Sequence, residues 1–346
     1  MISPERLELT EIFRIGDDAR GNTQQFGQIH DLAVNSVGQL LVGDGNAKVV
    51  YVFSEQGALV RAFGQQGEGP GEFRSILDVH VGPSDSVFVW DSSRERLSVF
   101  EPERHHFAYS IDVSDDEGTR YGIGLVATAQ NQFLMRFSTY YMLGIEAEGP
   151  SFDTIQFVDR QGKIVGEPVL YLPVTRHLMT ASATGISVII LPFSRDSFIR
   201  SGPEGLLYSG WNDSISVAIH TIKGNLEGRI RYSHQPIPVT QEEIDDHMKD
   251  MSVSDRKVFR EADLPETKPA YSTFVVDDQG RIWVKHTRTE ETTFVSWTVV
   301  NSESEAVYEV VLPARVNLRV VKENRAYGRA REEGGAPYVI VYKLGE

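Results

Sequence analysis

The feature that most constrains the fold is an internal repeat with a period of 47 residues. Segment 26–34 (FGQIHDLAV) aligns with segment 73–81 (FRSILDVHV), at a constant offset of 73 − 26 = 47. The match continues downstream, where Asp44 falls on Asp91, and a degenerate third unit begins near residue 123. A repeat of this length indicates a fold assembled from similar supersecondary units.

Each unit contains about four short runs that read as β-strands. The runs are rich in Val, Ile, Phe and Tyr and are separated by turns of Gly, Asn, Asp and Ser. In the first unit they cover 29–34, 39–43, 49–54 and 59–63. Helix patterns are rare along the chain, so we expect an all-β protein.

Counting the units predicts a closed ring. Six units begin near residues 29, 76, 123, 195, 271 and 316, and the last has room for only three strands. Residues 7–16 resemble 58–64, the fourth strand of the first unit. An N-terminal strand that completes the last unit removes the exposed sheet edges. The sequence therefore predicts one domain, 1–346, that is a six-bladed β-propeller of four-stranded blades.

A helical insertion is expected at 239–268, between blades four and five. Thr240 and Glu243 form the pattern of a capping box, which marks a helix start. A second short helix is expected from Ser254 through Phe259. The first helix would be amphipathic and could cover the central channel, or could only pack on a blade flank. The side chains that would form such a lid are Ile244, His247, Met248 and Met251.

The charge balance argues against several partners. The chain has 34 Lys and Arg against 49 Asp and Glu, a net charge of −15, which repels nucleic acid and anionic membrane surfaces. No apolar run reaches the ~18 residues of a transmembrane helix. The absence of cysteine excludes disulfides, thiol catalysis and cysteine-bound zinc.

Acidic residues on the innermost strands are the main candidates for chemistry. Asp31 and Asp78 occupy equivalent positions in two units, and His30 and His80 lie close to them. Such a group could bind calcium through carboxylate oxygens, or support a histidine-assisted hydrolysis. Hydrogen bonds from Asp to an adjacent blade explain the repeat equally well. The other polar candidates for the channel are Arg195, Asp196 and Asn317.

Other motifs indicate structural roles. Segment 64–71 is rich in glycine but lacks the Gly-Lys-Ser/Thr ending of a phosphate loop, so it is interpreted as a blade connector. No Gly-x-Ser-x-Gly motif is present. None of the nine histidines has zinc-protease spacing, and the pair at 105–106 is expected on an exposed hairpin turn. Trp90, Trp283 and Trp297 should pack between blades, whereas Trp211 should be the most exposed and could stack on a carbohydrate.

The connector also carries a family resemblance. Segment 63–73 (FGQQGEGPGEF), with the strands that follow it, resembles the blade junction of NHL-type six-bladed propellers. Segments 238–240 and 277–284 are similar to a bacterial family described as "6-bladed beta-propeller". The resemblance implies the fold but no single activity, since such propellers include lyases, lactonases, sensors and binding platforms.

The resemblance also bears on location. Members of that bacterial family are commonly exported or lipid-anchored, but Met1–Thr10 lacks the basic start and apolar core of a secretion signal. We therefore expect a periplasmic or extracytoplasmic protein if a signal has been removed, and a cytoplasmic one otherwise.

These observations favour a non-catalytic binding or scaffold propeller, a monomer that recognises a protein or a small ligand at the channel mouth. The alternative is a calcium-dependent hydrolase or lactonase that uses Asp31 and Asp78. The sequence predicts no cofactor, and calcium is the metal expected if the two acids bind one.

Overall fold

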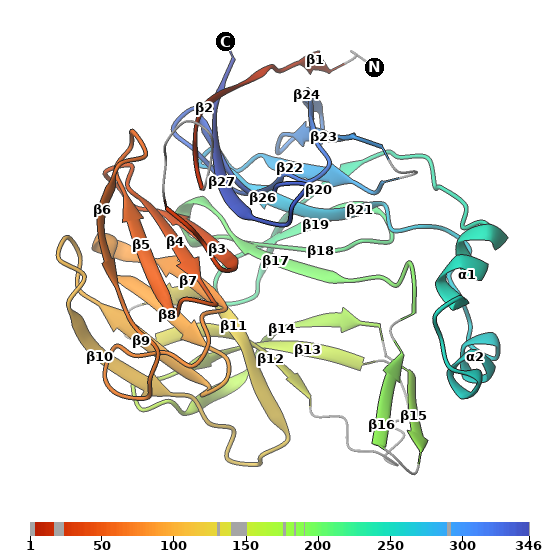
Figure 1. The fold of residues 1–346 in the computed structure, drawn as a ribbon, viewed down its shortest axis with the longest axis horizontal. Helices are drawn as coiled ribbons and strands as arrows, with labels where there is room; N and C mark the ends of the chain where they lie inside the picture. Colours follow the sequence, from red (N-terminus) through yellow and green to blue (C-terminus); the bar gives the residue numbers. More distant parts are fainter. Residues whose placement is uncertain are drawn as a thin grey trace.

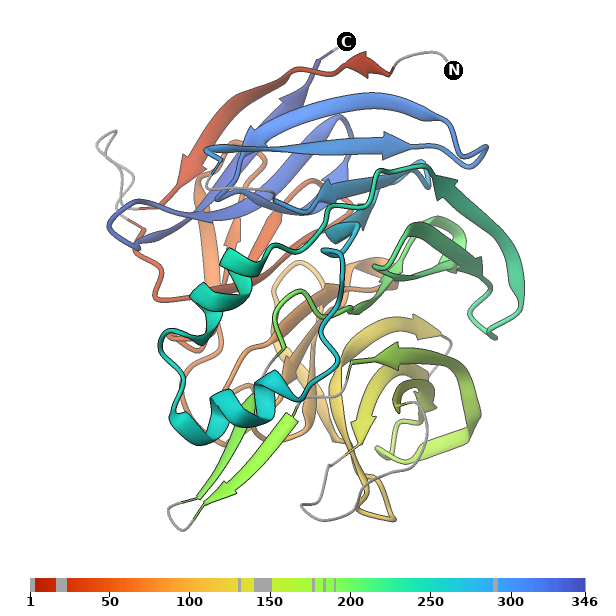
Figure 2. The ribbon, with the colours of Figure 1, turned by 90° about the vertical axis from the view of Figure 1, so that its right-hand side faces the viewer.

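The computed structural model describes residues 4–16, 24–129, 132–139, 151–175, 178–182, 185–189, 191–288 and 292–345. Six four-stranded antiparallel units surround a central axis (Figures 1 and 2). Five of them follow chain order outward from the innermost strand, and the sixth takes its outermost strand from the N-terminus. The predicted six-bladed propeller is thereby confirmed.

The first three blades take up the N-terminal half of the chain. Blade one comprises β3 (Ile29–Val34), β4 (Leu40–Asp44), β5 (Val49–Phe53) and β6 (Leu59–Phe63). Blade two comprises β7 (Asp78–Val81), β8 (Val87–Asp91), β9 (Arg96–Phe100) and β10 (Phe107–Asp112), with a 3-10 turn at Pro83–Asp85. Blade three comprises β11 (Arg120–Ala129), β12 (Gln132–Thr139), β13 (Ser151–Val158) and β14 (Ile164–Val174).

The second half forms the other three blades. Blade four comprises β17 (Ser197–Ser201), β18 (Leu207–Trp211), β19 (Ile215–His220) and β20 (Leu226–Tyr232), with a 3-10 turn at Pro203–Gly205. Blade five comprises β21 (Tyr271–Val276), β22 (Ile282–His286), β23 (Phe294–Val300) and β24 (Ala306–Pro313). Blade six comprises β25 (Asn317–Lys322), β26 (Arg325–Arg331), β27 (Pro337–Leu344) and the N-terminal β2 (Leu9–Ile15).

The two ends of the chain close the ring. Strand β2 pairs antiparallel with β27, with Phe13 opposite Val341, so the N-terminal strand is the outermost strand of the last blade. A two-residue strand, β1 (Glu5–Arg6), adds parallel to β24. Both termini therefore lie at the same edge of the disc (Figure 1). The predicted closure is confirmed.

The repeated aspartate at the end of the second strand anchors the entries of blades one and two. Asp44 is fully buried and accepts hydrogen bonds from the backbone N–H groups of Gly27 (2.7 Å) and Gln28 (3.0 Å). Asp91 accepts equivalent bonds from Arg74 (2.7 Å) and from residue 75 (3.1 Å). The repeat of 47 residues therefore places the same hydrogen bonds, between the connector and the second strand, in both blades.

The glycine-rich connector is structural, as predicted. Gly64 has a φ of 84°, and a Cβ there would lie 2.5 Å from the ring of Phe73. The connector then folds back on itself, with the N–H of Phe73 donating to the carbonyl of Gln65 (2.8 Å). Phe73 is fully buried between blades one and two, so this turn sets the spacing of the two blades.

The hydrophobic core is divided among the interfaces between neighbouring blades. One cluster joins blades five and six and contains Trp283 and Trp297, and the next joins blades two and three and contains Trp90. These three side chains are fully buried, as predicted, whereas Trp211 is half-buried. Large aromatic areas at blade interfaces explain why a ring with a central hole is stable.

The expectation of an exposed turn at 105–106 is right for His106, which is exposed, and wrong for His105. His105 does lie in the turn between β9 and β10, but only 4% of it is exposed. Its backbone has a φ of 53°, and its imidazole stacks on Phe63 of blade one with ring centroids 5.1 Å apart. His105 is therefore part of a blade interface and not a surface histidine.

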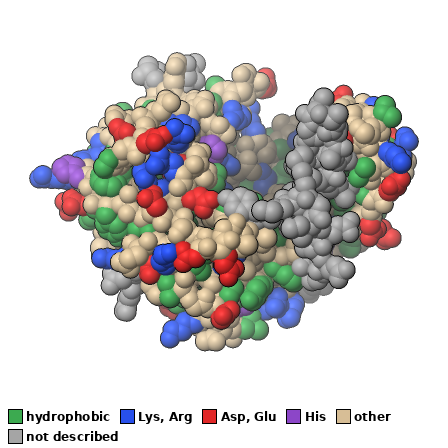
Figure 3. Space-filling model, turned by 90° about the horizontal axis from the view of Figure 1, so that it is seen from below, with side chains coloured by type: hydrophobic (Ala, Val, Ile, Leu, Met, Phe, Trp, Pro, Cys, Tyr) green, Lys and Arg blue, Asp and Glu red, His purple; other side chains and the backbone are tan. Residues whose placement is uncertain are grey.

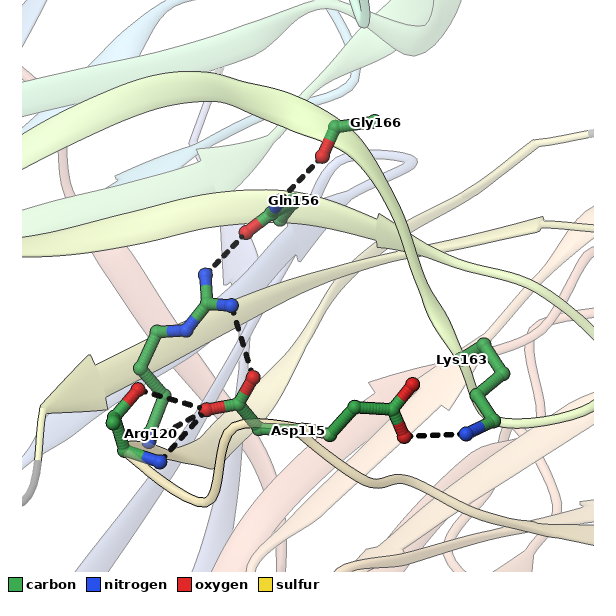
Figure 4. Close-up of polar contacts among 7 residues, drawn as sticks. Asp115, Arg120, Gln156, Lys163 and Gly166 are labelled. Atoms are coloured by element: carbon green, nitrogen blue, oxygen red, sulfur yellow. Dashed lines mark hydrogen bonds and ion pairs between the residues drawn. The ribbon is translucent and has the colours of Figure 1, made fainter.

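Blade three is braced by a polar chain at its entry (Figure 4). Asp115 accepts from the backbone N–H of Arg120 (2.9 Å) and from its guanidinium (3.0 Å). The same guanidinium donates to Gln156 on β13 (2.9 Å), and Gln156 donates to the carbonyl of Gly166 on β14 (2.6 Å). This chain ties the first strand of the blade to its outer two strands.

Two helices occur within the predicted insertion, α1 (Gln241–Met248) and α2 (Val253–Arg260). The capping box is confirmed, since Glu243 N–H donates to Thr240 Oγ1 (3.3 Å) and Thr240 N–H donates back to Glu243 Oε2 (3.0 Å). The second helix begins after Ser252, close to the expected start.

A hairpin that the sequence analysis missed accompanies these helices. Strands β15 (Leu178–Ser182) and β16 (Gly185–Ile189) pair antiparallel between blades three and four and lie against α2. The helices and the hairpin stand together on one side of the propeller (Figures 1 and 2). Seen from below, the described surface carries Lys and Arg side chains interspersed with Asp and Glu (Figure 3).

Candidate functional site

The site is a cavity of about 770 Å³ on the propeller axis. All six innermost strands line it, namely β3, β7, β11, β17, β21 and β25. Consecutive residues of each of these strands contribute to the cavity wall. Four of the residues predicted for the channel, His30, Asp31, Asp78 and His80, lie along its wall.

Asp31 is tied to the opposite end of the chain. Its Oδ1 accepts from Nε of Arg319 on β25 (3.0 Å) and pairs with the Nη2 of the same guanidinium (2.5 Å). Its Oδ2 accepts from the backbone N–H of Val79 on blade two (3.2 Å). Burial opposes ionisation of Asp31, but the charge of Arg319 and these hydrogen bonds lower the pKa of the carboxyl overall.

Asp78 repeats part of this arrangement one blade further on. Its Oδ2 accepts from the backbone N–H of Leu125 on β11 (3.2 Å), and its carboxyl is hydrogen-bonded to that of Asp31. Burial and the neighbouring charge of Asp31 raise the pKa of Asp78 well above its usual range. The close contact of the two carboxyls favours a shared proton, and the raised pKa makes Asp78 the member of the pair that is protonated more readily.

The hydrogen bonds to neighbouring blades explain why this aspartate repeats. Asp31 bonds the innermost strand of blade two, and Asp78 bonds that of blade three. The sequence analysis named this role as an alternative to metal binding. It did not foresee Arg319, although this residue lies only two positions from Asn317.

Three further arginines that the sequence analysis missed line the cavity. Arg136 on β12 pairs with Asp153 (Nε to Oδ2, 2.7 Å), so its charge is compensated. Arg200 on β17 and Arg329 on β26 have no carboxylate partner among the described residues. No sequence pattern marks these positions. Their location at the cavity depends on the tertiary arrangement of the strands that carry them.

The two histidines of the cavity are neutral at pH 7. Burial, followed by the charges of Arg329 and Lys48, lowers the pKa of His30. Burial also lowers the pKa of His80, and the charge of Asp31 only partly opposes this effect. Both side chains can therefore donate and accept hydrogen bonds without adding charge.

The other three predicted channel residues lie outside the cavity wall. Arg195 donates to the carbonyl (2.9 Å) and Oγ1 (2.8 Å) of Thr267 and so fastens the end of the insertion. Asp196 is exposed, and its backbone N–H donates to Asn212 Oδ1 (2.7 Å). Asn317 accepts from Nζ of Lys285 (2.6 Å) at the entry of blade six.

The predicted lid residues form a small core of their own. Ile244, Met248 and Met251 pack around Phe259, which is fully buried, and the ring of His247 lies 5.5 Å from that of Phe259. None of these side chains lines the cavity as described. Their packing holds α1 against α2, and the lid function stays a prediction.

The donor set is poorly suited to calcium. Within the described part of the chain, no group of three or more His, Asp or Glu side chains converges as metal ligands. Calcium takes six to eight oxygen ligands, but Asp31 is already paired with the guanidinium of Arg319 and hydrogen-bonded to Asp78.

No helix of the described residues is long and apolar enough to cross a bilayer.

The fold and the cavity define the class of protein, a six-bladed β-propeller with a polar central cavity. Residues 22–160 match the family model DUF5128, described as "6-bladed beta-propeller". This match and the fold confirm the resemblance to six-bladed bacterial propellers that the sequence predicts. No curated protein sequence matches the chain.

Solved structures agree on the fold. A member of the DUF4221 family from Bacteroides vulgatus aligns with a TM-score of 0.56 at 10% identity, over 99% of this chain and 100% of that chain. A candidate exported protein from Bacteroides fragilis aligns with a TM-score of 0.54 at 10% identity, over 99% and 95% of the two chains. The WD40 repeats of RRP9 align at 0.51 and 11% identity, over 98% and 100%. Such low identities show a shared fold alone.

Proposed function

We propose that this propeller is a non-catalytic binding protein that takes a small ligand into its central cavity. The observation that carries the proposal is the cavity of about 770 Å³, which is lined by ionisable side chains from several blades. Its volume falls within the ~300–1,000 Å³ of small-molecule sites. A closed ring of rigid strands holds these side chains in place before any ligand arrives, which lowers the entropy cost of binding.

The hydrolase alternative has less support. A carboxylate that acts as general base or metal ligand must be free and ionised, but Asp31 is paired with Arg319 and the raised pKa of Asp78 favours its protonated form. The hydrogen bonds of both acids to neighbouring blades favour a structural role, because they join three blades around the axis. A protein partner at the channel mouth is the other binding mode, and the experiment below separates it from a small ligand.

The test is equilibrium dialysis of the purified protein against a mixture of small metabolites, with retained compounds identified by mass spectrometry. Leu77 lines the cavity and is 37% exposed, so Leu77→Trp should narrow the cavity without disturbing the core. The matched control is Leu59→Trp on β6, where the side chain is 52% exposed on the outer edge of blade one.

We expect the wild type and Leu59→Trp to retain the same compounds and Leu77→Trp to lose them. If no compound is retained more strongly by the wild type than by Leu77→Trp, a small ligand in the cavity is refuted. A protein that associates equally well with both tryptophan variants would then favour a partner bound outside the cavity.

A further inference from the structure

Most charges around the cavity are compensated by a neighbour. Arg319 is paired with Asp31, and Arg136 is paired with Asp153. At the rim, the fully buried carboxylate of Asp277 accepts from the Nε of Arg281 (2.7 Å). Arg319 balances the charge of Asp31, and the raised pKa of Asp78 disfavours a second negative charge beside it.

Two guanidinium groups are exceptions. Arg200 donates from Nη1 to the carbonyl of Ile199 (2.8 Å) and from Nη2 to Oγ1 of Thr273 (3.2 Å), which are neutral acceptors. Arg329 donates to the backbone carbonyl of Ile29 (2.7 Å) and to that of the next residue. Both line the cavity, and neither has a carboxylate partner among the described residues.

The described surroundings of these groups supply no ion-pair partner. Arg200 lies over the rings of Phe198 and Phe274, with its Cζ 5.8 Å and 5.7 Å from their centroids, and these cation–π contacts favour the charged form but bring no counter-charge. Burial and the repulsion of Arg319 lower the pKa of Arg200 to about 10, so it is still charged at pH 7. Burial and the same neighbour also lower the pKa of Arg329. The positive charge of Arg319 therefore repels both guanidinium groups, and the charge of Asp31 only partly offsets this repulsion.

The cavity therefore holds two guanidinium groups without an ion-pair partner among the described residues, inside a protein whose net charge is −15. A charge removed from bulk water without a partner costs free energy. Structural side chains seldom carry that cost, whereas binding sites accept it because the ligand supplies the missing charge. A guanidinium also has the planar fork of donors that matches the oxygens of a carboxylate or phosphate.

From this we infer that the cavity binds a small organic anion, a molecule with a carboxylate or phosphate group that the guanidinium groups of Arg200 and Arg329 neutralise. The inference rests on the proposed function and names the chemical class of its ligand. The neutral imidazoles of His30 and His80 line the same wall and can hydrogen-bond the rest of the molecule.

The experiment is isothermal titration calorimetry of the full chain with succinate and, separately, with inorganic phosphate, at low and at moderate ionic strength. Arg200→Gln and Arg329→Gln remove one cavity charge each. Arg229→Gln is the matched control, because Arg229 is exposed on the outer strand β20 and its loss changes the net charge equally. Arg200→Lys keeps the charge but removes the fork.

We expect at least one probe to bind the wild type, and each cavity variant to bind it at least about tenfold more weakly, as for the loss of a charge-assisted hydrogen bond. Arg229→Gln should bind within about twofold of wild type, and Arg200→Lys should lie between the two. Weaker binding with added salt is also expected. Succinate and phosphate report separately which anionic group the cavity prefers.

The dialysis experiment distinguishes the possible failures. Retention of neutral or cationic compounds that Arg200→Gln retains equally well would overturn the anion inference and leave the proposed function intact. Retention of nothing by the wild type would overturn both. Probe affinities that are equal in Arg200→Gln, Arg329→Gln and Arg229→Gln would show that the anions bind outside the cavity, and would also overturn the inference.

Discussion

The buried aspartate that ends the second strand of a blade offers the sharpest test of how the repeat builds the fold. Asp44 Oδ2 accepts one backbone hydrogen bond, from Gly27 (2.7 Å). Its Oδ1 accepts three more, from Gln28 (3.0 Å), Asn46 (2.9 Å) and Ala47 (3.0 Å). The change Asp44→Ala removes all four bonds from a side chain that is fully buried.

The number of hydrogen bonds lost determines how far Asp44→Ala should lower the free energy of unfolding. At about 1 kcal/mol per hydrogen bond, with water reaching some of the amides, Asp44→Ala should lower the free energy of unfolding by about 3–4 kcal/mol. Asp44→Asn keeps the Oδ1 acceptor and should lose only about 1 kcal/mol. Blade four has an asparagine side chain in this role, since Asn212 Oδ1 accepts from the backbone N–H of Asp196 (2.7 Å) just before the innermost strand.

The assay is equilibrium unfolding in urea, supported by thermal melting. The control is Asp112→Ala, which removes an exposed carboxylate paired with Arg96 and should change stability by less than about 1 kcal/mol. The reasoning is refuted if Asp44→Ala is no less stable than this control, or if Asp44→Asn loses as much stability as Asp44→Ala.

Three further predictions follow from other parts of the fold. Phe259→Ala should increase proteolytic cleavage within 239–268 with little change in the main melting transition, because Phe259 belongs to a separate core; equal loss of both would contradict this. Deleting residues 1–16 should lower the melting temperature by several degrees, because it exposes the edge of β27, and an unchanged melt would contradict closure. Although burial opposes it, hydrogen bonds from Arg120 and its neighbours lower the pKa of Asp115 to about 2, so its stabilisation is present above about pH 4 and is lost towards pH 2. Urea midpoints of wild type and Asp115→Asn should therefore converge as pH falls, and a difference that does not depend on pH would exclude this role.

The sequence could predict the ring because local signals and the global fold agree. The offset of 47 residues, the missing fourth strand and the capping box at Thr240 each identify an element without tertiary information. The hairpin β15–β16 was missed because its short alternating runs look like part of a blade, and only the count of strands per blade separates it.

The candidate site was harder to predict, for a physical reason. Asp31 and Asp78 could be found because they repeat at equivalent positions. Arg200, Arg319 and Arg329 do not repeat, and they line one cavity only because the ring brings strands from blades four and six to the axis. The burial of His105 depends in the same way on a neighbouring blade, which a local pattern cannot report.

The most direct test of the central claim is a crystal structure of the protein grown with selenate, a phosphate analogue whose selenium can be located by anomalous scattering. The account predicts an anomalous peak inside the central cavity, with selenate oxygens about 3 Å from guanidinium nitrogens of Arg200 or Arg329. Peaks found only on the outer surface, with none in the cavity, would contradict it.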